Sequence, residues 1–117
     1  MKLRILDNTI RLRLTQKEVD LLATGEPVLC ATHFANNALI YSIKPLAFEH
    51  IDAEFANNVI SVKVNRNLAK TWAESDDISL ETKPGVHPYV LIEKDFKCLT
   101  ERNEDESDLF ENPNVNC

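Results

Sequence analysis

The chain has 117 residues, of which 44% are hydrophobic and 7% aromatic, and it carries a formal net charge of −6. Its length is that of one domain, whose core must consist largely of aliphatic side chains. We expect a cytoplasmic protein without membrane contact, because no apolar stretch approaches the ~20 residues of a membrane span and the N-terminal residues alternate charge with apolarity too early for a signal peptide.

Residues 2 to 14 are predicted to form a β-hairpin. Hydrophobic residues alternate with bases on both sides of Asp7-Asn8, and a period of two is typical of a strand with one buried face. Asp and Asn tolerate tight turns, so this dipeptide marks the turn. The side chains expected to face the core are those of Leu3, Ile5, Ile10, Leu12 and Leu14.

A short helix is predicted directly after this hairpin. Thr15 and Glu18 have the spacing of a capping box, which satisfies free N–H groups at the start of a helix. Val19 and Leu22 then lie on one helical stripe, and Gly25 ends the helix. The strands predicted next cover residues 28–34 and 39–43.

The second half of the chain repeats this order of elements. Asn57-Asn58 takes the place of the first turn, and Asn65 takes the place of the helix cap. The helical stripe of this half consists of Leu68, Ala69, Trp72 and Ala73. Its predicted strands cover residues 52–55, 60–64, 78–82 and 89–94.

Each half therefore has the order strand-strand-helix-strand-strand, over residues 1–44 and 51–94. We predict an α+β fold: a mainly antiparallel β barrel or sheet of about eight strands with two short helices, built from two repeats related by a pseudo-twofold axis. One half alone has a marginal core, and packing two halves together solves that problem. The alternative is that common α+β patterning produced two similar segments. The domain is expected to cover residues 1–99, followed by an acidic tail at residues 100–117.

Two resemblances follow from these patterns. The stretch "ISVKVNRNLAKTWAESDDISLET" resembles the strand-helix-strand centre of AbrB-type swapped-hairpin domains, although Asn65 and Thr15 stand where those domains have a proline before the helix. The segments "IRLRLTQKEV", "WAESD" and "EKDFKCLT", with the acidic tail, resemble a family of small uncharacterised bacterial proteins classed as a domain of unknown function (DUF7009-like). That second resemblance implies no activity and no catalytic residues.

The first hairpin presents the candidate interaction face. Four bases, Lys2, Arg4, Arg11 and Arg13, are expected to project from one side of it. In AbrB-like proteins such a basic hairpin would contact DNA phosphates, but four bases on a molecule of net charge −6 are a poor footprint for nucleic acid, and we expect no specific duplex binding. The alternative is that these bases are solvated or paired internally, for example with Asp52 and Glu54.

A weaker candidate site lies near the end of the last predicted strand. Glu93, Asp95 and Cys98 combine acids with a thiol, and neighbouring lysines could favour a thiolate. The alternative interpretation is the end of a strand that packs on the rim of the fold. We predict no metal site, since Cys30 and His33 would lie on opposite faces of a strand, and no cofactor.

The negative charge is concentrated at the C-terminal end. Residues 101–111 contain six acids and one base, whereas the rest of the chain carries 13 acids and 12 bases. Such a segment cannot bury enough apolar surface to become ordered, so a solvated tail is expected. Its charge is opposite to that of the first hairpin, and it is predicted to lie transiently over the hairpin with an affinity that salt weakens.

The leading functional hypothesis is a small non-enzymatic module that binds an unknown protein or small molecule, as a monomer or homodimer. One alternative is an AbrB-like DNA-binding transcriptional regulator, which would require the basic hairpin to be exposed and unpaired. A second alternative is a small enzyme that uses the Glu93–Cys98 segment, which would require a pocket and a perturbed carboxylate beside the thiol.

Overall fold

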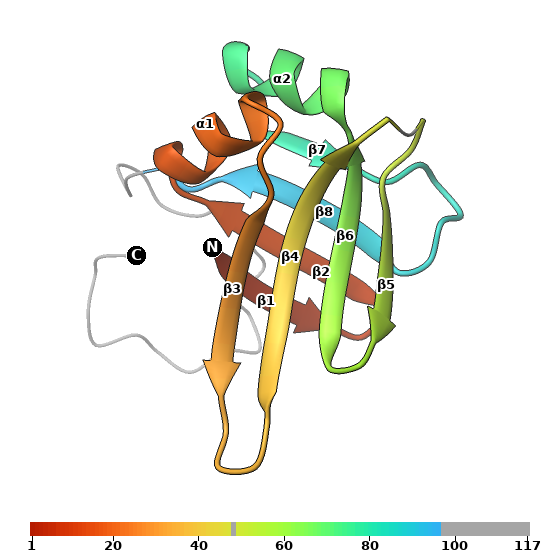
Figure 1. The fold of residues 1–117 in the computed structure, drawn as a ribbon. Helices are drawn as coiled ribbons and strands as arrows, with labels where there is room; N and C mark the ends of the chain where they lie inside the picture. Colours follow the sequence, from red (N-terminus) through yellow and green to blue (C-terminus); the bar gives the residue numbers. More distant parts are fainter. Residues whose placement is uncertain (48, 97–117) are drawn as a thin grey trace, which may run out of the picture.

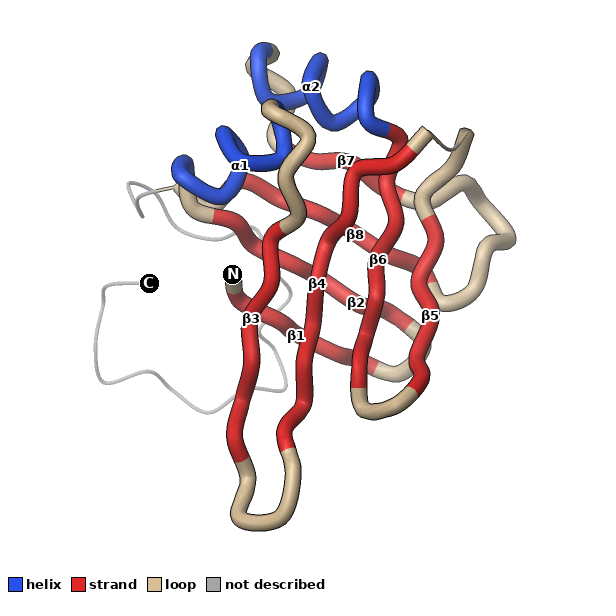
Figure 2. The backbone as a smooth tube through the Cα atoms, viewed as in Figure 1, coloured by secondary structure: helices blue, strands red, loops and turns tan. Residues whose placement is uncertain are grey.

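The computed structural model describes residues 1–47 and 49–96 of the chain. Two four-stranded sheets cross one another, and two short helices cover one end of them (Figure 1, Figure 2). The strands are β1 (Lys2–Leu6), β2 (Thr9–Leu14), β3 (Val28–His33), β4 (Ala38–Leu46), β5 (Asp52–Ala56), β6 (Val59–Asn65), β7 (Ser79–Glu81) and β8 (Tyr89–Lys94). The helices are α1 (Gln16–Ala23) and α2 (Arg66–Glu74).

Each sheet takes two strands from each half of the chain. The orders are β1-β2-β8-β7 in one sheet and β3-β4-β6-β5 in the other. Both sheets are antiparallel except at their centres, where β2 pairs with β8 and β4 pairs with β6 in parallel. Exchanging each strand for its counterpart in the other half converts one order into the other, which is compatible with a duplication.

The α+β prediction of eight strands and two short helices is confirmed, and the predicted order of elements in both halves matches the structure. The alternative of a closed barrel is wrong for the described residues. No strand of one sheet pairs with a strand of the other. β1 and β7 are the edge strands of one sheet, and β3 and β5 are the edge strands of the other.

The helix boundaries follow from the predicted capping residues. The Thr15 N–H donates to Glu18 Oε1 at 2.9 Å, and the Glu18 N–H donates to Thr15 Oγ1 at 3.4 Å, which completes the capping box. The Leu68 N–H donates to the side chain of Asn65 at 2.8 Å. Gly25 follows α1 with a φ of 88°, a left-handed conformation that favours glycine. Neither helix of the described residues has the length and apolarity needed to cross a membrane.

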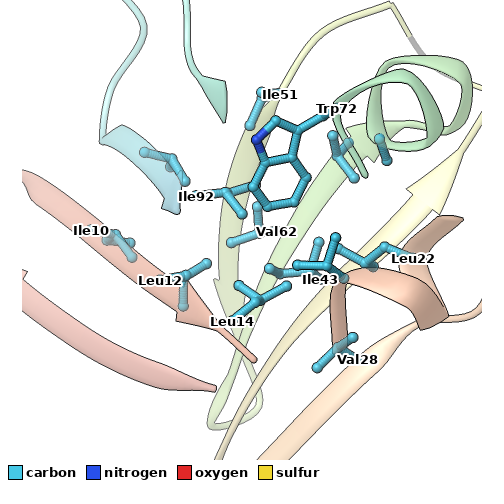
Figure 3. Packing of buried hydrophobic residues seen from close by; sticks show 14 of the residues in the cluster. Ile10, Leu12, Leu14, Leu22, Val28, Ile43, Ile51, Val62, Trp72 and Ile92 are labelled. Atoms are coloured by element: carbon cyan, nitrogen blue, oxygen red, sulfur yellow. The ribbon is translucent and has the colours of Figure 1, made fainter. Parts of the chain in front are cut away.

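The core lies between the two sheets and beneath the helices (Figure 3). Strands β2 and β6 contribute alternate residues to it, as their period of two predicts. Helix α2 contributes Trp72, which is 2% exposed and reaches towards Ile51 and Ile92. The buried hydrophobic residues are Ile10, Leu12, Leu14, Val19, Leu22, Val28, Ile43, Ile51, Ile60, Val62, Val64, Ala69, Trp72, Val90 and Ile92.

A partly buried ion pair connects the start of β1 to α1. The Met1 ammonium lies 2.7 Å from Glu18 Oε2, and Tyr41 Oη donates a hydrogen bond to the Met1 carbonyl at 3.2 Å. Burial alone would lower the pKa of the ammonium, but the hydrogen bond and charge of Glu18 outweigh it and raise that pKa above its usual 8.0. Burial alone would raise the pKa of Glu18, but hydrogen bonds from Met1 and Thr15 lower it below its usual 4.5.

A Glu18→Gln variant is expected to lose about 1–2 kcal/mol of unfolding free energy at neutral pH, because the ammonium then lacks its charged partner. The pair contributes fully between the two unfolded-state pKa values. Its contribution declines as the pH falls below 4.5 and is lost once the pH has fallen through the lowered pKa of Glu18. It likewise declines above pH 8.0 and is lost once the pH has risen through the raised pKa of Met1.

Chemical denaturation of the wild type and the variant across pH measures this difference. Asp20→Asn, an exposed change on the same helix, serves as the control and should leave the profile unchanged. A gap between wild type and Glu18→Gln that narrows neither as the pH falls below 4.5 nor as it rises above 8.0 would contradict the assignment.

Candidate functional site

The four predicted bases lie together on the outer face of the sheet that contains β1. In the antiparallel pair of β1 and β2, Lys2 lies opposite Arg13 and Arg4 lies opposite Arg11. Their neighbours Leu3 and Leu12 point to the core side, so alternation places all four bases on the other face. The sequence therefore located this basic face correctly.

Strand β8 and the residue directly after it supply the acids that neutralise much of this face. Glu93 Oε1 lies 3.0 Å from Arg11 Nε and 3.7 Å from Arg13 Nε, and Lys2 Nζ lies 3.1 Å from Asp95 Oδ2. These ion pairs exist because β8 runs parallel to β2 and places Glu93 beside Arg13. The first hairpin is thus paired internally in large part.

The suggested pairing of the first hairpin with Asp52 and Glu54 is wrong. Both acids belong to β5, in the other sheet, where Glu54 Oε1 binds Lys63 Nζ at 2.8 Å. The hairpin of β1 and β2, which carries the bases, and the hairpin of β5 and β6, which carries these acids, occupy equivalent positions in the two halves. They belong to different sheets, and each forms ion pairs within its own sheet.

Glu93 is the central residue of the charged cluster. Its side chain is 18% exposed, and its Oε1 atom is buried without a hydrogen bond of good geometry although Arg11 Nε is near. The attraction is therefore mainly one of charge, in a partly desolvated position where charges interact more strongly than at the surface. The Asp95 N–H donates to the Leu14 carbonyl at 2.8 Å, which fixes the chain as it leaves β8.

Arg4 differs from the other three bases. It is exposed on the edge strand β1, and no carboxylate among residues 1–47 and 49–96 forms an ion pair with it. It borders a shallow depression of about 140 Å³ that is also lined by Leu6, Thr9 and Arg11. The depression combines a guanidinium, a hydroxyl and an apolar side chain, which together suit a ligand with a carboxylate and an apolar group.

Tyr89 is the first residue of β8 and lies opposite Thr9, which lines this depression. Its hydroxyl donates a hydrogen bond to Glu81 of β7, and this bond, assisted by burial, raises the pKa of Tyr89 above its usual 10.0, while Arg11 opposes the shift. Tyr89 is therefore a neutral hydroxyl near the basic face. Sequence reasoning missed Leu6, Thr9 and Tyr89. Leu6 and Thr9 belong to the predicted hairpin, and its register with Arg4 opposite Arg11 could have indicated them. Tyr89 comes beside Thr9 only through the pairing of the distant strands β2 and β8.

Two residues of the weaker candidate site, Glu93 and Asp95, lie in the described part of the chain. Glu93 and Asp95 are occupied by bases of the first hairpin, and Cys98 lies outside the described residues, as does the predicted acidic tail at residues 100–117. The described residues hold no group of three or more His, Cys, Asp or Glu side chains placed to bind a metal ion.

Comparisons with known proteins give one family match. The match extends from residue 1 to residue 114, which is nearly the whole chain, whereas neither a curated protein nor a solved structure matches significantly. The resemblance to AbrB-type domains is not confirmed by any of these comparisons. The chain belongs to DUF7009, a family of unknown function.

Proposed function

We propose that this protein is a small non-enzymatic cytoplasmic interaction module that binds an acidic, extended segment of a partner protein along β1. The observation that carries the proposal is the environment of Arg4, an exposed guanidinium that has no ion-pair partner among the described residues. An arginine can bind a carboxylate through two parallel hydrogen bonds, which a lysine cannot do.

The surroundings of Arg4 favour a peptide over a free anion. β1 is an edge strand, so one side of its backbone is free of strand partners and can pair with an added strand. Leu6, at the end of β1, is 61% exposed and borders the depression beside Arg4. An extended segment with alternating acidic and apolar side chains would match both features.

The charge arrangement argues against the two alternative functions. DNA binding draws its affinity from several bases that neutralise phosphates, and here Lys2, Arg11 and Arg13 already have acidic neighbours. An enzyme that uses Glu93 and Asp95 would need carboxylates free to move protons, and both are held in ion pairs.

The proposal is tested with a blocked peptide of alternating Glu and Leu, five residues long, titrated into the labelled full chain while amide resonances are recorded. Shifts are expected at Arg4, Leu6 and Thr9. Arg4→Gln should weaken binding about fivefold, because one exposed charged contact contributes about 1 kcal/mol. Lys70→Gln, which removes an exposed base from α2, serves as the matched control and should leave the affinity unchanged.

A second peptide with Gln in place of every Glu separates charge from backbone pairing. It should bind more weakly, and added salt should weaken only the acidic peptide. The proposal is wrong if the acidic peptide causes no saturable shifts, if the shifts lie away from β1, or if Arg4→Gln and Lys70→Gln have equal effects.

A further inference from the structure

The four edge strands of the described residues differ in how they resist pairing with other chains. β1 carries the two bases Lys2 and Arg4, and β5 carries the two acids Asp52 and Glu54. β7 has only three residues. Charged side chains and short length are the usual means by which an edge strand avoids pairing with further strands. The bases of β1 act in this way against another basic strand, but not against the acidic segment proposed above.

The remaining edge strand, β3, has neither protection. Its six residues, VLCATH, include no Asp, Glu, Lys or Arg, and it is hydrogen-bonded to β4 on one side only. Leu29 is 62% exposed, and Phe34, directly after the strand, is 58% exposed. The hairpin of β3 and β4 also projects beyond the body of the domain (Figure 1), so its outer edge is accessible to a second chain.

The charges indicate which chain can pair there. If two copies joined through β1, bases would face bases, and if they joined through β5, acids would face acids, and like charges directly opposite one another destabilise a sheet. A contact of β1 with β5 of another copy would join opposite charges, but it repeats head to tail and does not close by itself. Two antiparallel β3 strands meet no charge of like sign and close as a twofold dimer.

We infer that β3 is the dimer interface of this protein, where it pairs antiparallel with β3 of a second copy and joins two four-stranded sheets into one of eight strands. The exposed side chain of Leu29 becomes covered near the twofold axis. The basic face on β1 belongs to the other sheet, so the dimer does not depend on the proposed peptide binding.

Sedimentation equilibrium of the full chain, from low micromolar to several hundred micromolar concentration, tests the inference. The mass is expected to rise to twice 13.3 kDa and no further. Ala31→Lys places a base in the middle of β3 in both copies and should weaken the dimer about tenfold or more. Ala56→Lys makes the same change on the exposed edge of β5 and should leave the dimer intact.

Circular dichroism of both variants establishes that they are folded, and Thr32→Lys repeats the test if Ala31→Lys is not. In the wild type, amide exchange along β3 should slow as the concentration rises. A monomer at every concentration overturns the inference. It is equally overturned by a mass that grows beyond two chains, or by a dimer that Ala56→Lys disrupts and Ala31→Lys does not, since these results indicate head-to-tail contacts of β1 and β5.

Discussion

A Trp72→Ala variant is expected to lose about 3–5 kcal/mol of unfolding free energy, which is a large part of the 5–15 kcal/mol typical of a small domain. Trp72 is 2% exposed and extends from α2 into the space between the two sheets (Figure 3). Its removal takes away a large buried surface, and residues on two sheets and a helix cannot all move to fill the cavity.

Leu68→Ala provides the matched control, because it shortens a side chain of the same helix that is 41% exposed. Its cost should remain below about 1 kcal/mol. Unfolding in urea should be followed by far-ultraviolet circular dichroism, since Trp72 is the one tryptophan of the chain and its fluorescence is lost with the substitution. Equal stability of the two variants would show that Trp72 does not hold the sheets and the helix together.

The local elements could be predicted from the sequence because their signals are local. The capping box of Thr15 and Glu18 and the alternation in β2 depend on residues only two or three positions apart. The strand partners could not be predicted in the same way. A period of two says which face of β2 is buried, but β8, its parallel neighbour, lies about 80 residues further along the chain.

The candidate site likewise combines features that local sequence patterns predicted with features that depend on strand pairing. Alternation placed Lys2, Arg4, Arg11 and Arg13 on one face, but the acids beside them depend on the pairing of β2 with β8. Alternation also predicted Ile5 to face the core, whereas it is 56% exposed, and Phe55 at the equivalent position of β5 is 70% exposed. Both residues lie on edge strands. The alternation along a strand determines which face of the sheet a side chain occupies, but it does not determine whether the core extends far enough to cover that side chain.

A Glu93→Lys variant is expected to lose about 2–3 kcal/mol of unfolding free energy. The change replaces the acid shared by Arg11 and Arg13 with a third base, in a position whose side chain is only 18% exposed. Glu26→Lys makes the same charge change at an exposed loop position and should have little effect. If the two variants are equally stable, the charged cluster on β2 and β8 does not stabilise the sheet.

The milder variant Glu93→Gln separates the structural role of Glu93 from its effect on binding. A double-mutant cycle with Arg11→Gln should give a coupling energy of about 1 kcal/mol, because each single change removes the same ion pair.

Loss of Glu93 also leaves Arg11 and Arg13 without this acid, so the acidic peptide should bind Glu93→Gln about two- to fivefold more tightly than wild type. An unchanged affinity would mean that the peptide contacts Arg4 alone. A weaker affinity would mean that the ion pairs of Glu93 with Arg11 and Arg13 hold β1 and β2 in the conformation that binds the peptide. The loss of that fixed conformation would then cost more affinity than the removal of the acid beside the two arginines adds.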